Sequence, residues 1–75
     1  MKIIESFFVM NMIPVQSSNL VAVGYDNGTL VIELRSGTYE YSGVPQSVYQ
    51  GLMSAHSHGE YHAKHIKHSY PYKRI

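Results

Sequence analysis

The sequence predicts an α+β fold in which a three- to four-stranded antiparallel β-meander is covered on one face by two short C-terminal helices. Up to Tyr41 the apolar residues alternate with a period of two, which is typical of half-buried strands. After Tyr41 the period becomes about 3.6, which is typical of amphipathic helices. A chain of 75 residues has room for one domain. Because it contains no cysteine, this domain must fold on packing alone.

The centre of the predicted sheet is a β-hairpin. Residues 20–25 and 29–34 are apolar, β-branched runs that flank Asp26-Asn27-Gly28, the strongest short hairpin signal. With Asn27 and Gly28 as a two-residue type I′ loop, alternate residues of the two strands pair on one face. That apolar face comprises Val21, Val23 and Tyr25 opposite Leu34, Ile32 and Leu30, respectively.

A third strand is predicted at residues 38–41, and the length of the loop before it decides where its tyrosines point. A two-residue Ser36-Gly37 loop places Tyr39 and Tyr41 on the core face, whereas a three-residue loop turns Glu40 inward. We expect the first register because it buries two aromatic rings and no carboxylate. It also places Glu33 opposite Glu40, an unfavourable pair of like charges.

The segment before the hairpin predicts an additional edge strand. Residues 13–16 alternate like a strand, and Pro14 restricts them to an edge or a strand start. Ser17-Ser18-Asn19 then forms the turn into the hairpin. Residues 1–11 precede this unit as an N-terminal extension, which we interpret as an added strand, a dimer arm or an extension from an upstream start codon.

Two helices are predicted after Pro45. The first carries an apolar stripe and ends near Gly59, a residue suited to a C-terminal cap, while Gly51 permits a close approach to the sheet. The second runs from Glu60 to about Lys67, and the last six residues extend along a sheet edge because of Pro71. The predicted core comprises Val21, Val23, Tyr25, Leu30, Ile32, Leu34, Tyr39, Tyr41, Val48, Leu52 and Ile66.

Several short motifs together resemble one known family. They are Val15 with Ser17-Ser18, Val23-Gly24-Tyr25-Asp26, Tyr39-Glu40-Tyr41, Val44-Pro45, Gly59 with Tyr61, and Tyr70 near the basic end. From Met12 to Ile75 the chain resembles the KTSC domain family, named for the C-terminus of some lysyl-tRNA synthetases and also found as free-standing bacterial and phage proteins. The resemblance implies a KTSC-like domain over residues 12–75 with no assigned activity, and the synthetase fusion implies RNA binding. The histidine density around His62 is not a family feature.

The charges are distributed unevenly along the chain. Residues 1–55 carry a net charge of −2 and residues 56–75 a net charge of +3, with all five histidines in the second part. The basic tail also contains tyrosines, and cations interleaved with aromatic rings are typical of single-strand RNA binders. We therefore predict nucleic-acid binding by Lys64, Lys67, Tyr70, Tyr72, Lys73 and Arg74, against the simpler interpretation that the tyrosines pack on the sheet and the lysines are merely solvated.

Other candidate sites receive less support from the sequence. His58, His62 and His65 would share one face of a continuous helix and could ligate nickel, copper or zinc, but Gly59 argues against continuity, so neither a metal site nor a cofactor is predicted. Tyr39-Glu40-Tyr41 would be a base-stacking platform only if its rings pointed away from the core. No nucleophile with a partner base can be assembled, so no enzyme is predicted.

The predicted function is therefore that of a small, non-catalytic RNA-binding module. The lack of cysteine and of an apolar run of about 20 residues predicts a cytoplasmic protein with no membrane association. The alternative is a protein-interaction module that engages a host factor through its apolar leader, Ile3-Ile4 and Phe7-Phe8-Val9. Residues 1–11 would also be the route to a homodimer.

Overall fold

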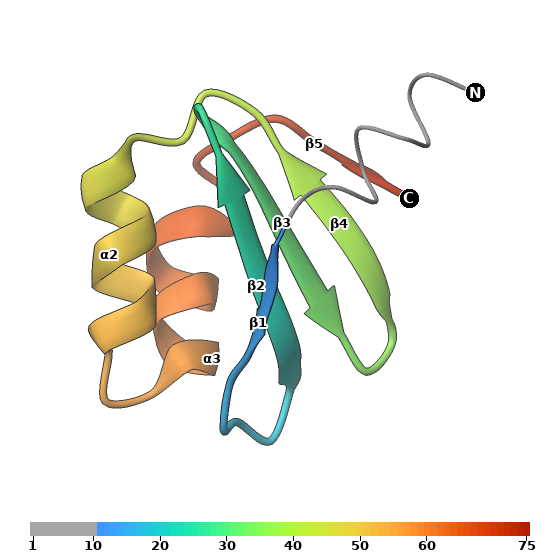
Figure 1. Cartoon of the computed structure of the whole chain (residues 1–75), viewed down its shortest axis with the longest axis vertical. Helices are drawn as coiled ribbons and strands as arrows, with labels where there is room; N and C mark the ends of the chain where they lie inside the picture. The colour runs from blue at the N-terminus through green and yellow to red at the C-terminus, as the bar shows by residue number, and fades with distance from the viewer. Residues whose placement is uncertain (1–10) are drawn as a thin grey trace.

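A computed structural model describes residues 11–75, which form a five-stranded antiparallel sheet with helices packed on one face (Figure 1). The strands follow the chain order from edge to edge: β1 Met12–Pro14, β2 Leu20–Asp26, β3 Thr29–Leu34, β4 Gly37–Tyr41 and β5 Tyr72–Arg74. The helical elements are α2 Gln46–Ser54, α3 His58–Tyr61 and the π-helix η1 His62–Ile66. The predicted α+β fold is confirmed, with more strands than expected because both the segment before the hairpin and the tail pair with the sheet. None of the helices within residues 11–75 is long and apolar enough to cross a membrane.

The central hairpin forms as predicted at its turn and departs from the prediction at its far end. Asn27 and Gly28 have φ angles of 49° and 88°, as a type I′ turn requires, and Tyr25 pairs with Leu30. The register then shifts between Leu20 and Ala22, so Leu20 is the residue opposite Leu34. The prediction that Val21 belongs to the core is therefore wrong: this irregularity gives the core position to Leu20, which is 1% exposed.

The third strand presents the predicted face but in a different register. The turn is made by Arg35 and Ser36, so Gly37 pairs with Leu34, and Tyr39 and Tyr41 lie on the core face opposite Ile32 and Leu30. The two-residue shift preserves the face and changes every partner. Glu33 and Glu40 accordingly lie opposite Thr38 and Val31, and the expected repulsion between the two carboxylates does not arise.

The helices begin and end at residues other than those predicted. α2 ends at Ser54, and α3 already begins at His58 because the Ser57 side chain accepts a hydrogen bond from the Glu60 N–H. Gly59 therefore lies inside a helix, and its predicted role as a cap is wrong, since the N-cap signal of Ser57 prevails.

Gly51 permits a close approach, although to a helix residue and not to the sheet. A Cβ atom built on Gly51 would lie 2.7 Å from Cζ of Tyr61, closer than real contacts allow. The missing side chain thus lets the Tyr61 ring pack on α2, and the predicted contact between Gly51 and the sheet is replaced by this one.

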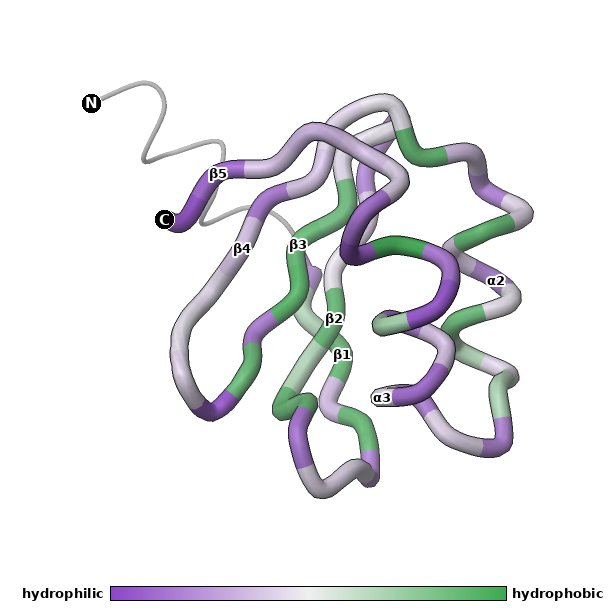
Figure 2. Tube along the Cα trace, turned by 180° about the vertical axis from the view of Figure 1, so that it is seen from behind, coloured by the Kyte–Doolittle hydropathy of each residue, from purple (hydrophilic) through white to green (hydrophobic). Residues whose placement is uncertain are grey.

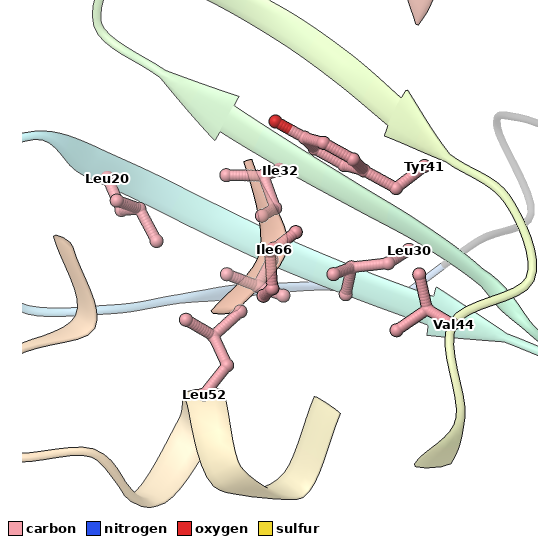
Figure 3. Packing of buried hydrophobic residues seen from close by; sticks show 8 residues of the cluster. Leu20, Leu30, Ile32, Tyr41, Val44, Leu52 and Ile66 are labelled. Carbon is pink, nitrogen blue, oxygen red and sulfur yellow. The ribbon is translucent and has the colours of Figure 1, made fainter. Parts of the chain in front are cut away.

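The core lies between the sheet and the helices, where Leu52 and Ile66 face the strands (Figure 3). Two of its members were absent from the prediction, Leu20 and Val44. Val44 is held there by Tyr25, whose hydroxyl donates a 2.5 Å hydrogen bond to its carbonyl oxygen. The buried cluster comprises Leu20, Val23, Leu30, Ile32, Tyr41, Val44, Leu52 and Ile66.

Candidate functional site

The helices cover only part of their face of the sheet, and a groove of about 420 Å³ lies where β4 and β5 face α3 and η1. Apolar residues lie along β2 and β3, whereas β5 is hydrophilic (Figure 2). Four aromatic rings line the groove, three from tyrosine and one from histidine, so we call it the tyrosine groove. Its lining residues are Asn19, Leu20, Leu34, Arg35, Ser36, Tyr39, Tyr41, Gly59, His62, Ala63, Lys67 and Tyr72.

The pairing of β5 with β4 builds the aromatic wall of the tyrosine groove. Tyr72 pairs with Tyr41 and Arg74 with Tyr39, so these four side chains lie on one face of the sheet. The Tyr72 ring lies 5.7 Å from the Tyr39 ring in an edge-on arrangement and 5.6 Å from the Tyr41 ring. Because Tyr72 is 57% exposed, the wall offers an aromatic surface to a ligand.

The floor of the groove is a buried hydrogen-bonded pair. The Tyr41 hydroxyl lies 2.8 Å from Nε2 of His62, and the two residues are 2% and 7% exposed. Burial raises the pKa of the Tyr41 hydroxyl, and the neighbouring Tyr72 and Tyr39 raise it further. Burial also lowers the pKa of the His62 imidazole, with a smaller contribution from the Lys67 ammonium. Both groups are therefore neutral at pH 7, and one donates a hydrogen to the other.

The wide turn of η1 places His62 in this position. The Lys67 N–H bonds to the His62 carbonyl oxygen at 2.9 Å, five residues back, and within η1 the buried residues are His62 and Ile66. A π-helix of this kind is rare and is found frequently at functional sites. Here it directs Ile66 into the core and His62 under the groove.

Cationic side chains lie around the groove. Arg35 and Lys67 line it, and Arg35 Nε donates a 2.8 Å hydrogen bond to the Ser18 carbonyl oxygen. The guanidinium of Arg74 lies 6.0 Å from the centre of the Tyr39 ring and donates to the Ser36 carbonyl oxygen at 2.9 Å. Each arginine thus donates one N–H group to a backbone carbonyl and has further N–H groups that could bind a ligand.

The residues predicted to bind nucleic acid lie on different parts of the surface. Lys67 and Tyr72 line the groove, and Arg74 lies beside it over Tyr39. Lys73 pairs with Glu40 on the opposite face of the sheet, where its Nζ lies 3.5 Å from a carboxylate oxygen.

Two further members of the predicted set lie outside the groove. Tyr70 packs against the core, and Lys64 is on the exposed surface of η1. Arg35 was not among the predicted site residues, Tyr39 was considered only as part of a stacking platform, and His62 only as a metal ligand. Alternation had already placed Tyr39 on the correct face, while His62 carries no local signal for its contact with Tyr41.

The three histidines considered as metal ligands point to different partners. His58 Nδ1 lies 2.8 Å from the Leu52 carbonyl oxygen, His62 bonds to Tyr41, and the His65 ring lies 4.5 Å from the Tyr61 ring. The predicted helix break at Gly59 is wrong, since α3 runs on into η1, yet continuity does not gather the imidazoles. Among residues 11–75 there is no group of three or more histidine or acidic side chains placed to hold a metal ion.

Comparison with known families decides the identity of this fold. The sequence profile of the KTSC domain matches residues 16–70. The chain belongs to the KTSC domain family. The crystal structure of a KTSC domain protein from Yersinia pestis is similar, with 40% sequence identity and a TM-score of 0.86 over 89% of this chain and 99% of that one. A comparison with curated proteins found no match.

The central Tyr39-Glu40-Tyr41 motif of this KTSC domain has a divided role. Tyr41 belongs to the core and to the groove floor, while Tyr39 is half-buried in the groove wall. Glu40 points to the other face of the sheet, where it pairs with Lys73. The motif thus places two rings at the groove and none on the opposite face.

Proposed function

We propose that this KTSC domain is a non-catalytic RNA-binding module and that the tyrosine groove is its binding surface. The observation that carries the proposal is the pair formed by exposed Tyr72 and half-buried Tyr39 beside Arg35, Lys67 and Arg74. A base stacked on such a ring gains about 1–3 kcal/mol, and the adjacent cations neutralise the phosphates on either side of it.

The chemistry of the groove favours binding over catalysis. Its buried polar pair, Tyr41 and His62, is hydrogen-bonded internally, and the Tyr41 hydroxyl has a raised pKa, which makes it a poor nucleophile. Aromatic rings and fixed guanidinium groups instead provide planes and donors of the kind that hold unpaired bases and phosphates. These features support the proposal that the groove binds RNA.

The test is a titration of fluorescently labelled single-stranded RNA at 50 and 200 mM salt, followed by anisotropy. With about three phosphates neutralised, affinity should fall roughly tenfold to twentyfold over this range. Tyr72→Ala should weaken binding by about tenfold or more, because it removes the exposed stacking ring. Affinity that does not change with salt, or that survives Tyr72→Ala, would contradict the proposal.

Two lysines on opposite faces of the sheet provide a matched control. Lys67→Ala should weaken binding and reduce the slope of log affinity against log salt by about 0.7, the value of one phosphate contact on a single strand. Lys73→Ala should leave both unchanged, since Lys73 pairs with Glu40 away from the groove. Charge reversal at Lys64 and Lys67 together should abolish binding if the neighbouring surface of η1 also contacts phosphates.

A protein-interaction module is the second candidate, and the position of β1 at an edge of the sheet formed by residues 11–75 supports it. β1 is a three-residue edge strand whose Ile13 is 43% exposed, and an extended peptide of a host protein can add to such an edge. The leader residues named for this role lie outside the described part of the chain. A bound protein that survives nuclease treatment and is lost in Ile13→Lys would favour this candidate, because a charge on an edge strand opposes strand addition.

A further inference from the structure

A second cleft, of about 500 Å³, opens next to the tyrosine groove, between the turn at Ser17-Ser18 and the segment that joins α2 to α3. The two hollows share three lining residues, Asn19, Gly59 and Ala63. They are therefore neighbouring parts of one surface depression that meet at these residues. The full lining of this polar cleft is Gln16, Ser17, Ser18, Asn19, His56, Ser57, His58, Gly59, Glu60 and Ala63.

The boundary between the two hollows is made of Gly59, Ala63 and the amide side chain of Asn19. Ala63 is exposed and carries only a methyl group. Gly59 carries none, and a Cβ built on it would lie 3.5 Å from Nδ2 of Asn19, in ordinary contact. Larger side chains at positions 59 and 63 would form a ridge between the groove and the polar cleft. Gly59 and Ala63 leave the two hollows connected.

The chemistry of the polar cleft differs from that of the tyrosine groove. Its wall provides the amides of Gln16 and Asn19 and several hydroxyl groups, which can donate and accept hydrogen bonds. Histidines apart, the charged residue in its lining is Glu60, whose carboxylate repels phosphate. Such a cleft suits base edges and ribose hydroxyls, whereas the adjoining groove provides stacking rings and cations.

The ligand that matches both hollows is an unpaired strand. In a duplex the bases are stacked inside and proteins bind chiefly the phosphates and 2′-hydroxyls along its shape, which requires rows of cations. Arg35 and Lys67 are the cationic side chains in the lining of the groove, and the polar cleft adds an acid. A single strand, by contrast, can place one base against Tyr72 and a following base in the polar cleft.

We propose that the tyrosine groove and the polar cleft form one continuous site for a single-stranded RNA segment of about four nucleotides, the short end of the range for small single-strand-binding domains. The segment passes over Gly59 and Ala63. The inference rests on the proposed RNA binding and adds to it the class of RNA, its length and a second set of contacts.

The experiment compares uridine oligonucleotides of two, four and six residues, which have no secondary structure of their own, by NMR titration of the ¹⁵N-labelled full chain. The dinucleotide should shift the amides near Tyr72, and the longer oligonucleotides should also shift those of Gln16 and His56. Affinity should rise by about tenfold from two to four residues, the gain expected for one more held base, and then level off.

Two variants test the continuity, and one serves as a matched control. Ala63→Leu, which keeps high helix propensity, should reduce the gain with length to less than threefold. His56→Ala should act in the same direction from the far side of the boundary. Ser47→Leu makes the same kind of exposed substitution on α2, away from both hollows, and should change nothing.

The outcomes separate the two proposals. Binding that gains with length in the wild type and in Ser47→Leu, but not in Ala63→Leu, supports the continuous site. Binding whose length gain is intact in Ala63→Leu and His56→Ala overturns the continuous site and leaves the groove as the RNA surface. Failure of every oligonucleotide to shift any amide overturns both.

Discussion

Two parts of the same sheet face are covered differently in this domain. Over β2 and β3, Leu52 and Ile66 pack with Leu30 and Ile32 in a buried cluster that is mainly aliphatic (Figure 3). Over β4 and β5 the helices leave the groove open, and its rings belong to tyrosine and histidine. Aliphatic groups gain by leaving water, whereas a tyrosine ring can pack on one side and still offer a hydroxyl or a face to a ligand. In this chain of 75 residues, one half of the face is thus closed by buried aliphatic side chains, while the other half leaves aromatic and polar side chains accessible.

Tyr41 stands at the boundary between the two parts. Its ring belongs to the buried cluster, and its hydroxyl bonds to His62 on the groove floor. The groove therefore rests on the core, and a change at Tyr41 or His62 should affect both parts, whereas a change at Tyr72 should affect only the open one.

The largest expected difference between the parts comes from truncating one residue in each. Leu52→Ala should lower the free energy of unfolding by about 2–5 kcal/mol, because Leu52 is fully buried and its loss leaves a cavity. Tyr72→Ala should cost less than about 1.5 kcal/mol, since the ring is mostly exposed. Urea denaturation followed by circular dichroism measures both. Equal losses would mean that the open part stabilises the fold as much as the covered part does.

A smaller effect should come from removing the hydroxyl at the boundary. Tyr41→Phe leaves the buried Nε2 of His62 without its partner, which should cost about 1–3 kcal/mol. Tyr39→Phe removes a hydroxyl from the half-buried groove wall and should cost less than about 0.5 kcal/mol. The same denaturation assay applies, and a Tyr41→Phe variant as stable as Tyr39→Phe would show that the hydrogen bond is not needed to hold the groove floor.

Local patterns in the sequence predicted most of the side chains that face the core, but not how far along its partner each strand lies. Asn27-Gly28 fixed the hairpin turn, because two successive left-handed positions suit these residues. Leu20 and Val21 are both apolar, so alternation could not reveal the irregularity that buries one and not the other. The turn before β4 was equally ambiguous, since moving the register by two residues keeps the same face.

The candidate site depended on contacts between residues far apart in the sequence. The tail was expected to be basic, aromatic and extended along an edge, and it is, but its strand register decides which side chains meet. Alternation along β5 sends Tyr72 and Arg74 to the groove and Lys73 to the other face, where Glu40 lies 3.5 Å away. The tail sequence alone contains no signal for its partner strand, so the full set of groove residues could not be assembled from it.

The smallest expected effect that still separates the two parts of the sheet face is a dependence of stability on pH through His62. Its pKa is lower in the folded chain than the value of about 6.5 in the unfolded chain, because burial disfavours the charged imidazole. The unfolded chain therefore binds more protons between these two values, and the stability present above pH 6.5 is lost as the pH falls towards the folded pKa. The loss is at most about 1.4 kcal/mol per pH unit. Unfolding free energies at pH 7.5 and 5.5 should differ less in His62→Gln than in the wild type, whereas His68→Gln, at an exposed position, should keep the wild-type difference. If His62→Gln retained the full pH dependence, the protonation of the groove floor would not be coupled to folding.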